Sequence, residues 1–560
     1  MHRMRKTAGL GLLALLTVAL ATVTATAGAG DGKSREFVVV YEQGVSGADG
    51  RAAVKAAGGT VVSENAAIGV ATVRSDDRDF AAAAARQDRL KGAAPNEAIG
   101  FAPREQQSRW QDVEKVAGAK GKAPKARKLK AGKAEPLAGL QWDMAMIGAT
   151  ADGSHAAQQG SRAVRVGVID TGIDGSHPDI RPNFDRRLSR NFTVDDPVVD
   201  GACDTDPDRF CTDPADVDEG GHGTHVAGII GAAINGFGTA GVAPKVDLVN
   251  LRAGQDSGYF FLGPTLDALT YAGDNGIDVV NMSFYIDPWL YNCRANPADN
   301  PQEREQQALV IDATQRALKY ARDRGVTLVA AEGNGHTDLG KPVTDDTSPD
   351  YPDQEESPRE RTIDNSCLTM PTEGENVVGV TSVAPSKRKA YYSDYGLEQA
   401  DVSAPGGDTR DGNSPTSNVA NAVLSPYPLA ALKEELPRVI DDAGNPLTPA
   451  VKKVCSGKEC AYYRYLQGTS MAAPHVTGVA ALAVAQFGTP DGKGGVGLAP
   501  AEVERLLRTT ATDTPCPAQN PFVYTNLPSP VPPALCEGTP QLNGFYGDGI
   551  VDARRILIGH

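Results

Sequence analysis

The residues whose types could perform nucleophilic catalysis are a serine, a histidine and an aspartate, each beside glycine or threonine at the border of an apolar segment. Ser470 lies in GTSMAAPHVTGVAAL, residues 468–482, where a run of small apolar residues predicts a buried helix. A serine at a helix start is most often an N-cap. As a nucleophile at the positive end of the helix dipole, Ser470 would need a histidine base and an orienting carboxylate.

Candidates for both partners stand at equally constrained positions. Asp170 ends the predicted strand AVRVGVID and precedes Thr171-Gly172, where an aspartate could also serve only as a turn cap. His222 lies in GGHGTHVAGIIGA, where glycines allow close backbone approach at the start of a predicted helix. A zinc site on His222 and His225 is disfavoured, because no further ligand completes a zinc-binding pattern.

These three residues require a scaffold that brings distant segments together. From about residue 136, near-continuously apolar strands alternate with helical patterns, which predicts an α/β domain with a doubly wound, mostly parallel sheet covered on both faces. In such sheets the active groups gather at the carboxyl ends of the strands. The predicted strands are AVRVGVID, KVDLVNLR, IDVVNMSF and VTLVAAEG, and the predicted helices fall in 221–234, 264–276, 303–325 and 471–487.

Longer motifs surround all three residues, in the chain order Asp170, His222, Ser470. These motifs are VIDTGIDGSHPDI at 168–180, GHGTHVAGIIGA at 221–232 and GTSMAAPHVTGVAAL at 468–482, with AAEGNG at 330–335 as a fourth. In their residues and in their order along the chain, these motifs resemble those of the subtilisin-like serine proteases, the subtilase family. The resemblance implies that Ser470 attacks a peptide carbonyl, His222 transfers the proton and Asp170 orients the imidazole.

The same resemblance assigns further site residues. Asn334 matches the family's oxyanion donor, which would act with the backbone N–H of Ser470, although a turn role between glycines is the alternative. The substrate-binding walls would be Ser283-Phe284-Tyr285, where the family commonly has Ser-Leu-Gly, and Ala331-Glu332-Gly333, where Ala-Ala-Gly is usual. A tyrosine in place of glycine could narrow the cleft, and Glu332 places a carboxylate beside the pocket wall.

The front of the chain divides into three segments before the catalytic domain, 136–560. Residues 1–27 have basic residues, an apolar run and a small-residue cleavage site, which predicts a secretory signal, with an uncleaved membrane anchor as the alternative. Residues 36–102 alternate strand and helix patterns and predict a small α+β domain, which the resemblance identifies as an inhibitory pro-domain. The linker 103–135 includes a stretch, 104–133, with ten basic and three acidic residues, and we expect it to be cut by proteolysis.

All eight cysteines lie after residue 200, which together with the signal indicates an exported protein with disulfides. Proximity in sequence favours Cys203 with Cys211, Cys455 with Cys460, and Cys516 with Cys536, and leaves Cys293 with Cys367 by elimination. We expect a soluble, secreted, extracellular monomer, because no later apolar segment is long enough to span a bilayer.

The net charge of −15 argues against nucleic acid or an anionic membrane as a partner. Acidic residues are concentrated in the loop 194–219, which has ten carboxylates and one arginine. Asp204, Asp206 and Asp208 alternate, but Arg209 and Ala215 stand where an EF-hand needs glycine and glutamate. A solvated acidic loop is favoured, a structural calcium ion stays an alternative, and no cofactor or catalytic metal is required.

The sequence therefore predicts a secreted serine endopeptidase, made as a self-processing precursor that acts on polypeptides and is inhibited by its own pro-domain. A catalytically silent homologue that binds peptides is the alternative, although all four catalytic positions are intact. An esterase is disfavoured, because no GxSxG motif surrounds Ser470.

Overall fold

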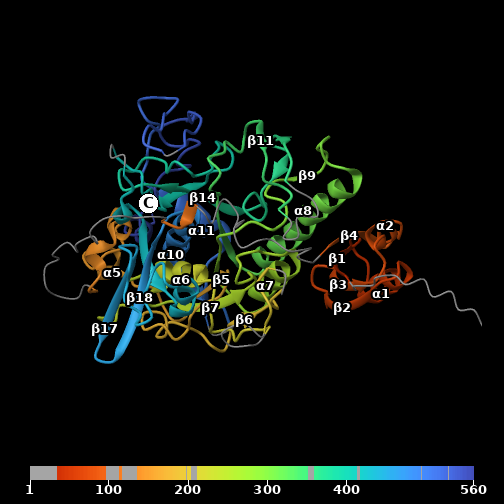
Figure 1. Ribbon diagram of the computed structural model, residues 1–560, viewed down its shortest axis with the longest axis horizontal. Coiled ribbons are helices and arrows are strands. Elements are labelled where there is room, and N and C mark those ends of the chain that lie inside the picture. The colour runs from red at the N-terminus through yellow and green to blue at the C-terminus, as the bar shows by residue number, and fades with distance from the viewer. Residues whose placement is uncertain are drawn as a thin grey trace, which may run out of the picture.

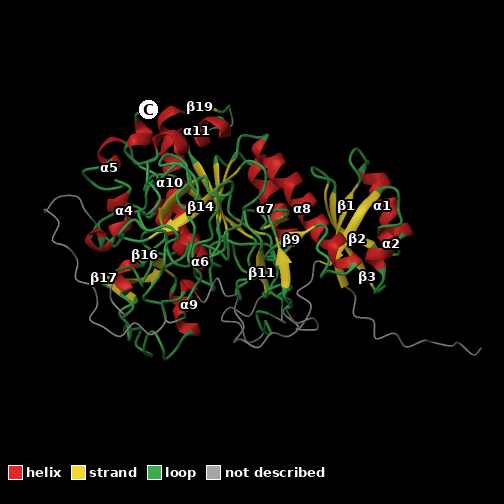
Figure 2. Cartoon of the chain, turned by 90° about the horizontal axis from the view of Figure 1, so that it is seen from above, coloured by secondary structure: helices red, strands yellow, loops and turns green. Residues whose placement is uncertain are grey.

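A computed structural model of the chain has two folded units joined through a linker (Figures 1 and 2). The structure describes residues 35–95, 113–116, 135–196, 199–203, 211–350, 358–412, 416–492, 495–527 and 529–559. The predicted signal, 1–27, and most of the predicted linker, 103–135, lie outside the described residues.

The larger unit is built on a seven-stranded parallel sheet, in the order β15-β14-β10-β8-β5-β7-β6. Almost every residue of its longer strands is buried, as the continuous apolar runs predicted. The α/β, parallel-sheet prediction is therefore confirmed. The strands are β5 Arg165–Ile169, β6 Arg190–Asn191, β7 Asp247–Arg252, β8 Val279–Met282, β10 Thr327–Ala331, β14 Val377–Val383 and β15 Val402–Pro405.

Helices cover both faces of this sheet and divide its core in two. Helices α6, His222–Gly231, and α10, Thr469–Phe487, pack against each other and against one face. Helices α7, Leu262–Asp274, and α8, Pro301–Arg322, pack together on the other. The remaining helices are α4 Trp142–Met146, α5 Ser154–Ala157, α9 Leu429–Glu434 and α11 Pro500–Thr510, with 3-10 turns η1 Ala138–Leu140, η2 Val419–Asn421 and η3 Arg555–Leu557.

The smaller unit is the predicted α+β domain. Its antiparallel sheet has the order β2-β3-β1-β4, with two helices on one face. Its elements are β1 Arg35–Tyr41, α1 Gly47–Ala56, β2 Thr60–Asn65, β3 Val70–Ser75, α2 Phe80–Ala84 and β4 Leu90–Pro95.

The two faces of this small sheet have different partners. Because side chains alternate along a strand, Phe37, Val39 and Tyr41 of β1 face the domain's own helices, whereas Val38 and Val40 join the core around α7 and α8. Polar contacts flank that apolar patch. Nη1 of Arg316 donates to the carbonyl of Tyr41 at 2.8 Å, Nδ2 of Asn65 to Asp267 at 2.9 Å, and Lys91 pairs with Asp312 at 2.5 Å.

Short strands outside the main sheet form the long insertions. The three-stranded sheet β16-β18-β17 was not predicted, because the only feature noted in that part of the sequence was the cysteine pair Cys455 and Cys460. These strands are β16 Val423–Tyr427, β17 Val451–Ser456 and β18 Glu459–Leu466, and the short pairs are β9 Asn292–Cys293 with β13 Cys367–Leu368, β11 Val343–Asp345 with β12 Arg361–Ile363, and β19 Thr489–Pro490 with β20 Val496–Gly497.

The four predicted disulfides are all present, and all lie in the larger unit. They join Cys203 to Cys211, Cys293 to Cys367, Cys455 to Cys460 and Cys516 to Cys536.

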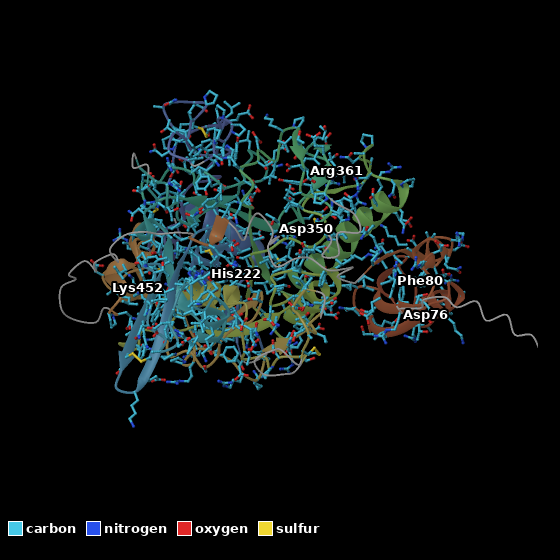
Figure 3. The ribbon with its side chains drawn as sticks, in the orientation of Figure 1. Asp76, Phe80, His222, Asp350, Arg361 and Lys452 are labelled. Carbon is cyan, nitrogen blue, oxygen red and sulfur yellow. A yellow bond between two sulfur atoms is a disulfide. The ribbon has the colours of Figure 1, made fainter. Side chains whose placement is uncertain are left out.

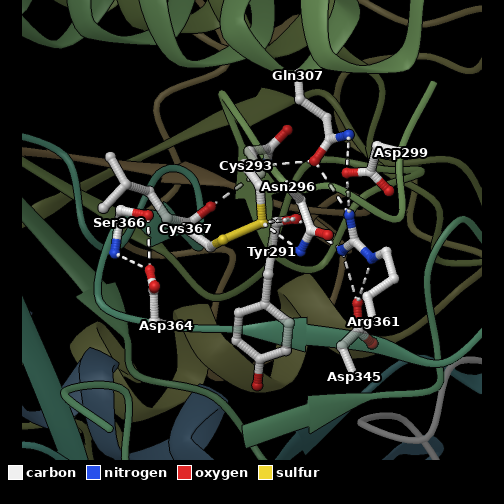
Figure 4. The surroundings of a disulfide bond; sticks show 12 residues. Tyr291, Cys293, Asn296, Asp299, Gln307, Asp345, Arg361, Asp364, Ser366 and Cys367 are labelled. Carbon is white, nitrogen blue, oxygen red and sulfur yellow. Dashed lines mark hydrogen bonds and ion pairs between the residues drawn. A yellow bond between two sulfur atoms is a disulfide. The ribbon is translucent and has the colours of Figure 1, made fainter. Parts of the chain in front are cut away.

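Beside the Cys293–Cys367 bridge, which pairs β9 with β13, the fully buried Arg361 is held by Asp299 at 3.0 Å and Asp345 at 2.7 Å (Figure 4). A buried guanidinium with two carboxylates is charge-compensated, and this ionic cluster adds to the apolar cluster around the bridge, which includes Tyr291, Leu339 and Ile363.

One expectation from the sequence is wrong. Helix α10 is long and apolar enough to cross a membrane by length and composition, although no such later segment was expected. Its most apolar stretch is 83% buried inside the molecule, however, as is usual for the core helix of a globular protein.

Candidate active site

The carboxyl edge of the sheet brings the three predicted catalytic residues together. Asp170 directly follows β5, His222 is the first residue of α6, and Ser470 is the second residue of α10. Ser470 is not the N-cap, because Gly468 holds that position and no side chain caps the helix. The capping explanation for Ser470 therefore does not apply.

Asp170 and His222 are directly joined. Nδ1 of His222 lies 2.7 Å from Oδ1 of Asp170, which is completely buried and also accepts the N–H of Thr171 at 2.8 Å. The approach depends on Gly223, since a Cβ there would lie 2.1 Å from the carbonyl oxygen of Gly172. Figure 3 shows His222 inside the larger unit, well away from the labelled Asp76 and Phe80 of the smaller one.

The surroundings of His222 favour its charged form. Burial by itself lowers the pKa of the imidazole, but the carboxylates of Asp170 and Glu114 and their hydrogen bonds outweigh burial and raise the pKa well above its ordinary value. Oε2 of Glu114 lies 3.3 Å from Nε2 of His222. In this structure the imidazole is therefore held between two carboxylates.

The hydroxyl of Ser470 is directed at the same Glu114. Its Oγ donates to Oε1 of Glu114 at 2.5 Å and lies 3.4 Å from the carbonyl oxygen of Ser283. Ser470 is 1% exposed and Glu114 is 5% exposed, so the contact is screened from solvent.

Asn334 is fixed in an orientation that aims its amide at the carboxylate of Glu114. Its Oδ1 accepts the backbone N–H and the hydroxyl of Thr469, at 2.9 and 3.0 Å, so its Nδ2 faces the site and donates to Oε1 of Glu114 at 3.2 Å. The preceding Gly333 has a φ of +123°, which L side chains rarely adopt. Asn334 thus contacts Thr469, the first residue of α10, through a backbone turn that glycine allows easily.

A cleft opens beside these residues with a cavity of about 110 Å³. Ser283, Phe284 and Tyr285 line it, and Phe284 stacks on Phe260 with ring centroids 4.1 Å apart. Tyr285 is also largely buried in the cluster around the Cys293–Cys367 bridge, so it contributes to both the cleft wall and that cluster. The other lining residues are Glu114, Lys115, Thr171, Gly220, His222, Asp256, Ser257, Gly258, Tyr259, Asp287, Tyr427, Leu466 and Ser470.

The second predicted wall, Ala331-Glu332-Gly333, is not among the residues that line this cavity. Glu332 is fully buried, and neither of its carboxylate oxygens has a hydrogen-bond partner among the described residues. Burial first, and then the charges of Glu373, Asp401 and Asp394, raise its pKa well above the ordinary value. Because a Cβ on Gly379 would lie 2.5 Å from Oε2 of Glu332, this carboxyl points toward β14 instead of the cleft.

Sequence reasoning missed two carboxylates of the site. Asp218 is buried and accepts from Gly221 N at 2.8 Å, Thr224 N at 2.9 Å and Thr171 Oγ at 3.0 Å, so it ties the turn after Asp170 to the start of α6. The sequence signal that could have identified Asp218 is its position, three residues before Gly221 at the start of the histidine motif. Glu114 gave no signal, because an isolated acid in a basic linker has no pattern.

The acidic loop contributes a carboxylate group beside the cleft. Ligand atoms of Asp195, Asp213 and Asp256 lie within 4.8 Å of one another. The buried guanidinium of Arg252 pairs with all three, at 3.5 Å from Asp195 and 3.2 Å from Asp256. Arg252 therefore balances part of this negative charge. Asp204, Asp206 and Asp208 lie outside the described residues.

The chain is similar to known proteins over most of its length. A model of the subtilase family matches residues 161–526, and a model of the fervidolysin N-terminal prodomain matches residues 20–96. The thermophilic serine proteinase of Bacillus sp. (strain AK1) is 29% identical over 329 residues, 59% of this chain and 54% of that protein. Subtilisin DY of Bacillus licheniformis is 27% identical over 350 residues, 62% of this chain and 84% of that protein.

Solved structures agree in fold. The epidermin leader peptide processing serine protease from Staphylococcus aureus has a TM-score of 0.60 at 20% identity, over 94% of this chain and 98% of that one. Fervidolysin from Fervidobacterium pennivorans has a TM-score of 0.54 at 21% identity, over 95% of this chain and 62% of that one. The chain thus belongs to the subtilase family of serine peptidases and carries an N-terminal pro-domain of the fervidolysin type.

Proposed function

We propose that this protein is a secreted serine endopeptidase, made as a self-processing precursor, in which Asp170, His222 and Ser470 are the catalytic triad and Asn334 is an oxyanion donor. The observation that carries the proposal is the convergence of these four residues at one edge of the sheet. Asp170 lies 2.7 Å from His222, and Asn334 is locked toward the start of the helix that bears Ser470.

The geometry suits acyl transfer once Glu114 has left. Nε2 of His222 then becomes available to take the Ser470 proton as Oγ attacks the peptide carbonyl, and Asp170 stabilises the imidazolium that forms. The tetrahedral oxygen carries the negative charge between the Asn334 amide and the Ser470 N–H. The imidazolium next delivers its proton to the leaving amine, and water hydrolyses the acyl-enzyme by the same steps.

Polypeptides are the proposed substrates, including the linker of the chain itself. The pro-domain is the proposed intramolecular inhibitor, since its sheet docks on α7 and α8 through an apolar patch. Extracellular location is supported by four disulfides in the catalytic domain and by the predicted signal at 1–27.

Covalent labelling with a fluorophosphonate tests the proposal. The matured protein should form one adduct, mapped by mass spectrometry to Ser470, and Ser470→Ala should form none. Thr469→Ser is a matched control, because it keeps the hydroxyl that contacts Asn334 and leaves the nucleophile in place. A folded, matured protein without an adduct on Ser470 would instead identify a catalytically silent peptide-binding homologue.

A further inference from the structure

A short piece of the linker lies in the catalytic centre. Residues 113–116, here called the Glu114 segment, are described between two linker stretches that are not. The carbonyl of Glu114 accepts the N–H of Gln467 at 3.3 Å, the carbonyl of Val113 accepts Nε2 of Gln467 at 2.9 Å, and Lys115 forms a β-bridge with Leu466. The segment is thus anchored to the chain that leads directly into α10.

The anchoring does not resemble the presentation of a substrate bond. In acyl transfer, the scissile carbonyl oxygen must point at the oxyanion donors. Here the backbone carbonyl of Glu114 is used by Gln467, and the group that faces Asn334 and Ser470 is the side-chain carboxylate. The segment therefore occupies the centre without offering a peptide bond to Ser470.

One carboxylate contacts three of the four proposed catalytic residues. Oε1 accepts from Ser470 at 2.5 Å and from the Asn334 amide at 3.2 Å, and Oε2 lies 3.3 Å from Nε2 of His222. Ser470, the proposed nucleophile, donates its hydrogen bond to Glu114 and not to His222. The amide of Asn334 is already occupied by Glu114, and the imidazole of His222 is paired with the negative charge of the same side chain. Each of these contacts has to break before attack can begin.

The surroundings provide room and compensation for this side chain. Gly468 has a φ of +154°, and a Cβ there would lie 2.9 Å from Cγ of Glu114. A buried carboxylate is costly unless it is hydrogen-bonded and paired, and here two donors and an imidazole fulfil that condition. Glu114 is also one of only three acids in the basic stretch 104–133, so few other linker residues could supply the charge.

We propose that Glu114 is an internal inhibitor of the uncleaved chain, a side-chain plug that holds the catalytic centre inactive separately from the docked pro-domain. The inference rests on the proposed function, because it takes Ser470 and His222 as the groups to be blocked. Activation then requires the Glu114 segment to leave the centre, either before the linker is cut or as a result of cutting.

The rate at which the intact chain labels with fluorophosphonate tests the plug. Full-length wild type, Glu114→Ala, Glu114→Asp and the charge-matched control Glu105→Ala are refolded by dilution, labelled at short times and resolved on gels that separate intact from cleaved chain. Because Glu114→Ala removes charge-assisted hydrogen bonds that hold Ser470 and Asn334, the intact variant should label about 10- to 100-fold faster than intact wild type.

The other two variants separate a plug from a general effect of linker charge. Glu114→Asp keeps the charge but has a side chain shorter by one methylene, so its carboxylate should not contact Ser470 and the intact variant should label nearly as fast as Glu114→Ala. Glu105→Ala removes a charge elsewhere in the linker and should label like wild type. Equal labelling of intact wild type and Glu114→Ala, or equal acceleration by Glu105→Ala, overturns the plug. Matured wild type serves as the reference, because its failure to label at Ser470 would refute the proposed triad instead.

Discussion

The N-terminal part of the chain contacts the catalytic domain in two places that differ in chemistry. The pro-domain meets α7 and α8 through an apolar patch that includes Val38, Val40 and Ile68, with polar contacts around it. The Glu114 segment meets the catalytic centre through one carboxylate and a few backbone hydrogen bonds. The first contact is broad and lies away from His222, whereas the second is small and touches it.

The two contacts therefore have different roles: the apolar patch contributes affinity between the pro-domain and the catalytic domain, and Glu114 contributes inhibition of the catalytic residues. Apolar area removed from water stabilises association roughly in proportion to its extent, and it is indifferent to the charge state of the active site. A single carboxylate contributes little area, but it disables the groups it contacts. The patch therefore holds the proposed inhibitory pro-domain in place, and the carboxylate is a second, separate element that acts on the catalytic groups themselves.

Ser470→Ala should produce the largest effect, because it removes the nucleophile and the hydroxyl donor to Glu114 while leaving the apolar patch unchanged. Loss of this group in subtilisin lowers activity by roughly 10⁶-fold. Peptide hydrolysis should vanish and the uncleaved precursor should accumulate, as followed by mass spectrometry in a host that lacks other proteases. Normal maturation of the variant in that host would refute self-processing.

Asn334→Leu sharpens the comparison, because it removes an amide that serves both the proposed transition state and Glu114. In the matured enzyme kcat should fall by roughly 10²- to 10³-fold with KM nearly unchanged. Steady-state kinetics on a peptide substrate measures both constants. An unchanged kcat would make Asn334 a turn residue only.

Ile68→Ala weakens the other contact, the apolar patch between the pro-domain and helices α7 and α8. Ile68 is 7% exposed and packs in the core shared with α7 and α8, so truncation should weaken pro-domain docking by about 2 kcal/mol, or roughly 30-fold. Val62→Ala is the matched control, since Val62 is 49% exposed. Gel filtration of freshly processed protein should show earlier release of the Ile68→Ala pro-domain, and equal release from both variants would contradict the docking role of the patch.

The smallest expected effect is a shift in pH dependence. Asp170 and Glu114 raise the pKa of His222 against the effect of burial, so the paired imidazolium is present below that raised pKa and is lost as the pH rises through it. Labelling requires the neutral imidazole. The pH midpoint for labelling should therefore be higher for the intact wild type than for intact Glu114→Gln, and coincident midpoints would show that Glu114 does not control His222.

Much of this architecture was predictable because its signals are local. The period of apolar residues predicted the strands β5, β7, β8 and β10 and the four long helices around them, but not the strands β6, β14 and β15 of the same sheet. The cysteine spacing predicted the four disulfides that the structure contains. The strands β16, β17 and β18 escaped prediction, because their pairing depends on partners distant in the sequence. The placement of Glu332 escaped it as well, since the direction of a side chain depends on neighbours such as Gly379.

The sequence by itself indicated the candidate catalytic residues, the motifs that hold them and four strands of the sheet with their helices, because each of these lies in a continuous stretch of chain. Only the tertiary structure decided that Glu114 meets Ser470, Asn334 and His222, a contact between residues separated by 356 positions in the case of Ser470. No periodicity or motif marks such a contact. It depends on the anchoring of a short linker segment to Gln467 and on the space that Gly468 leaves open.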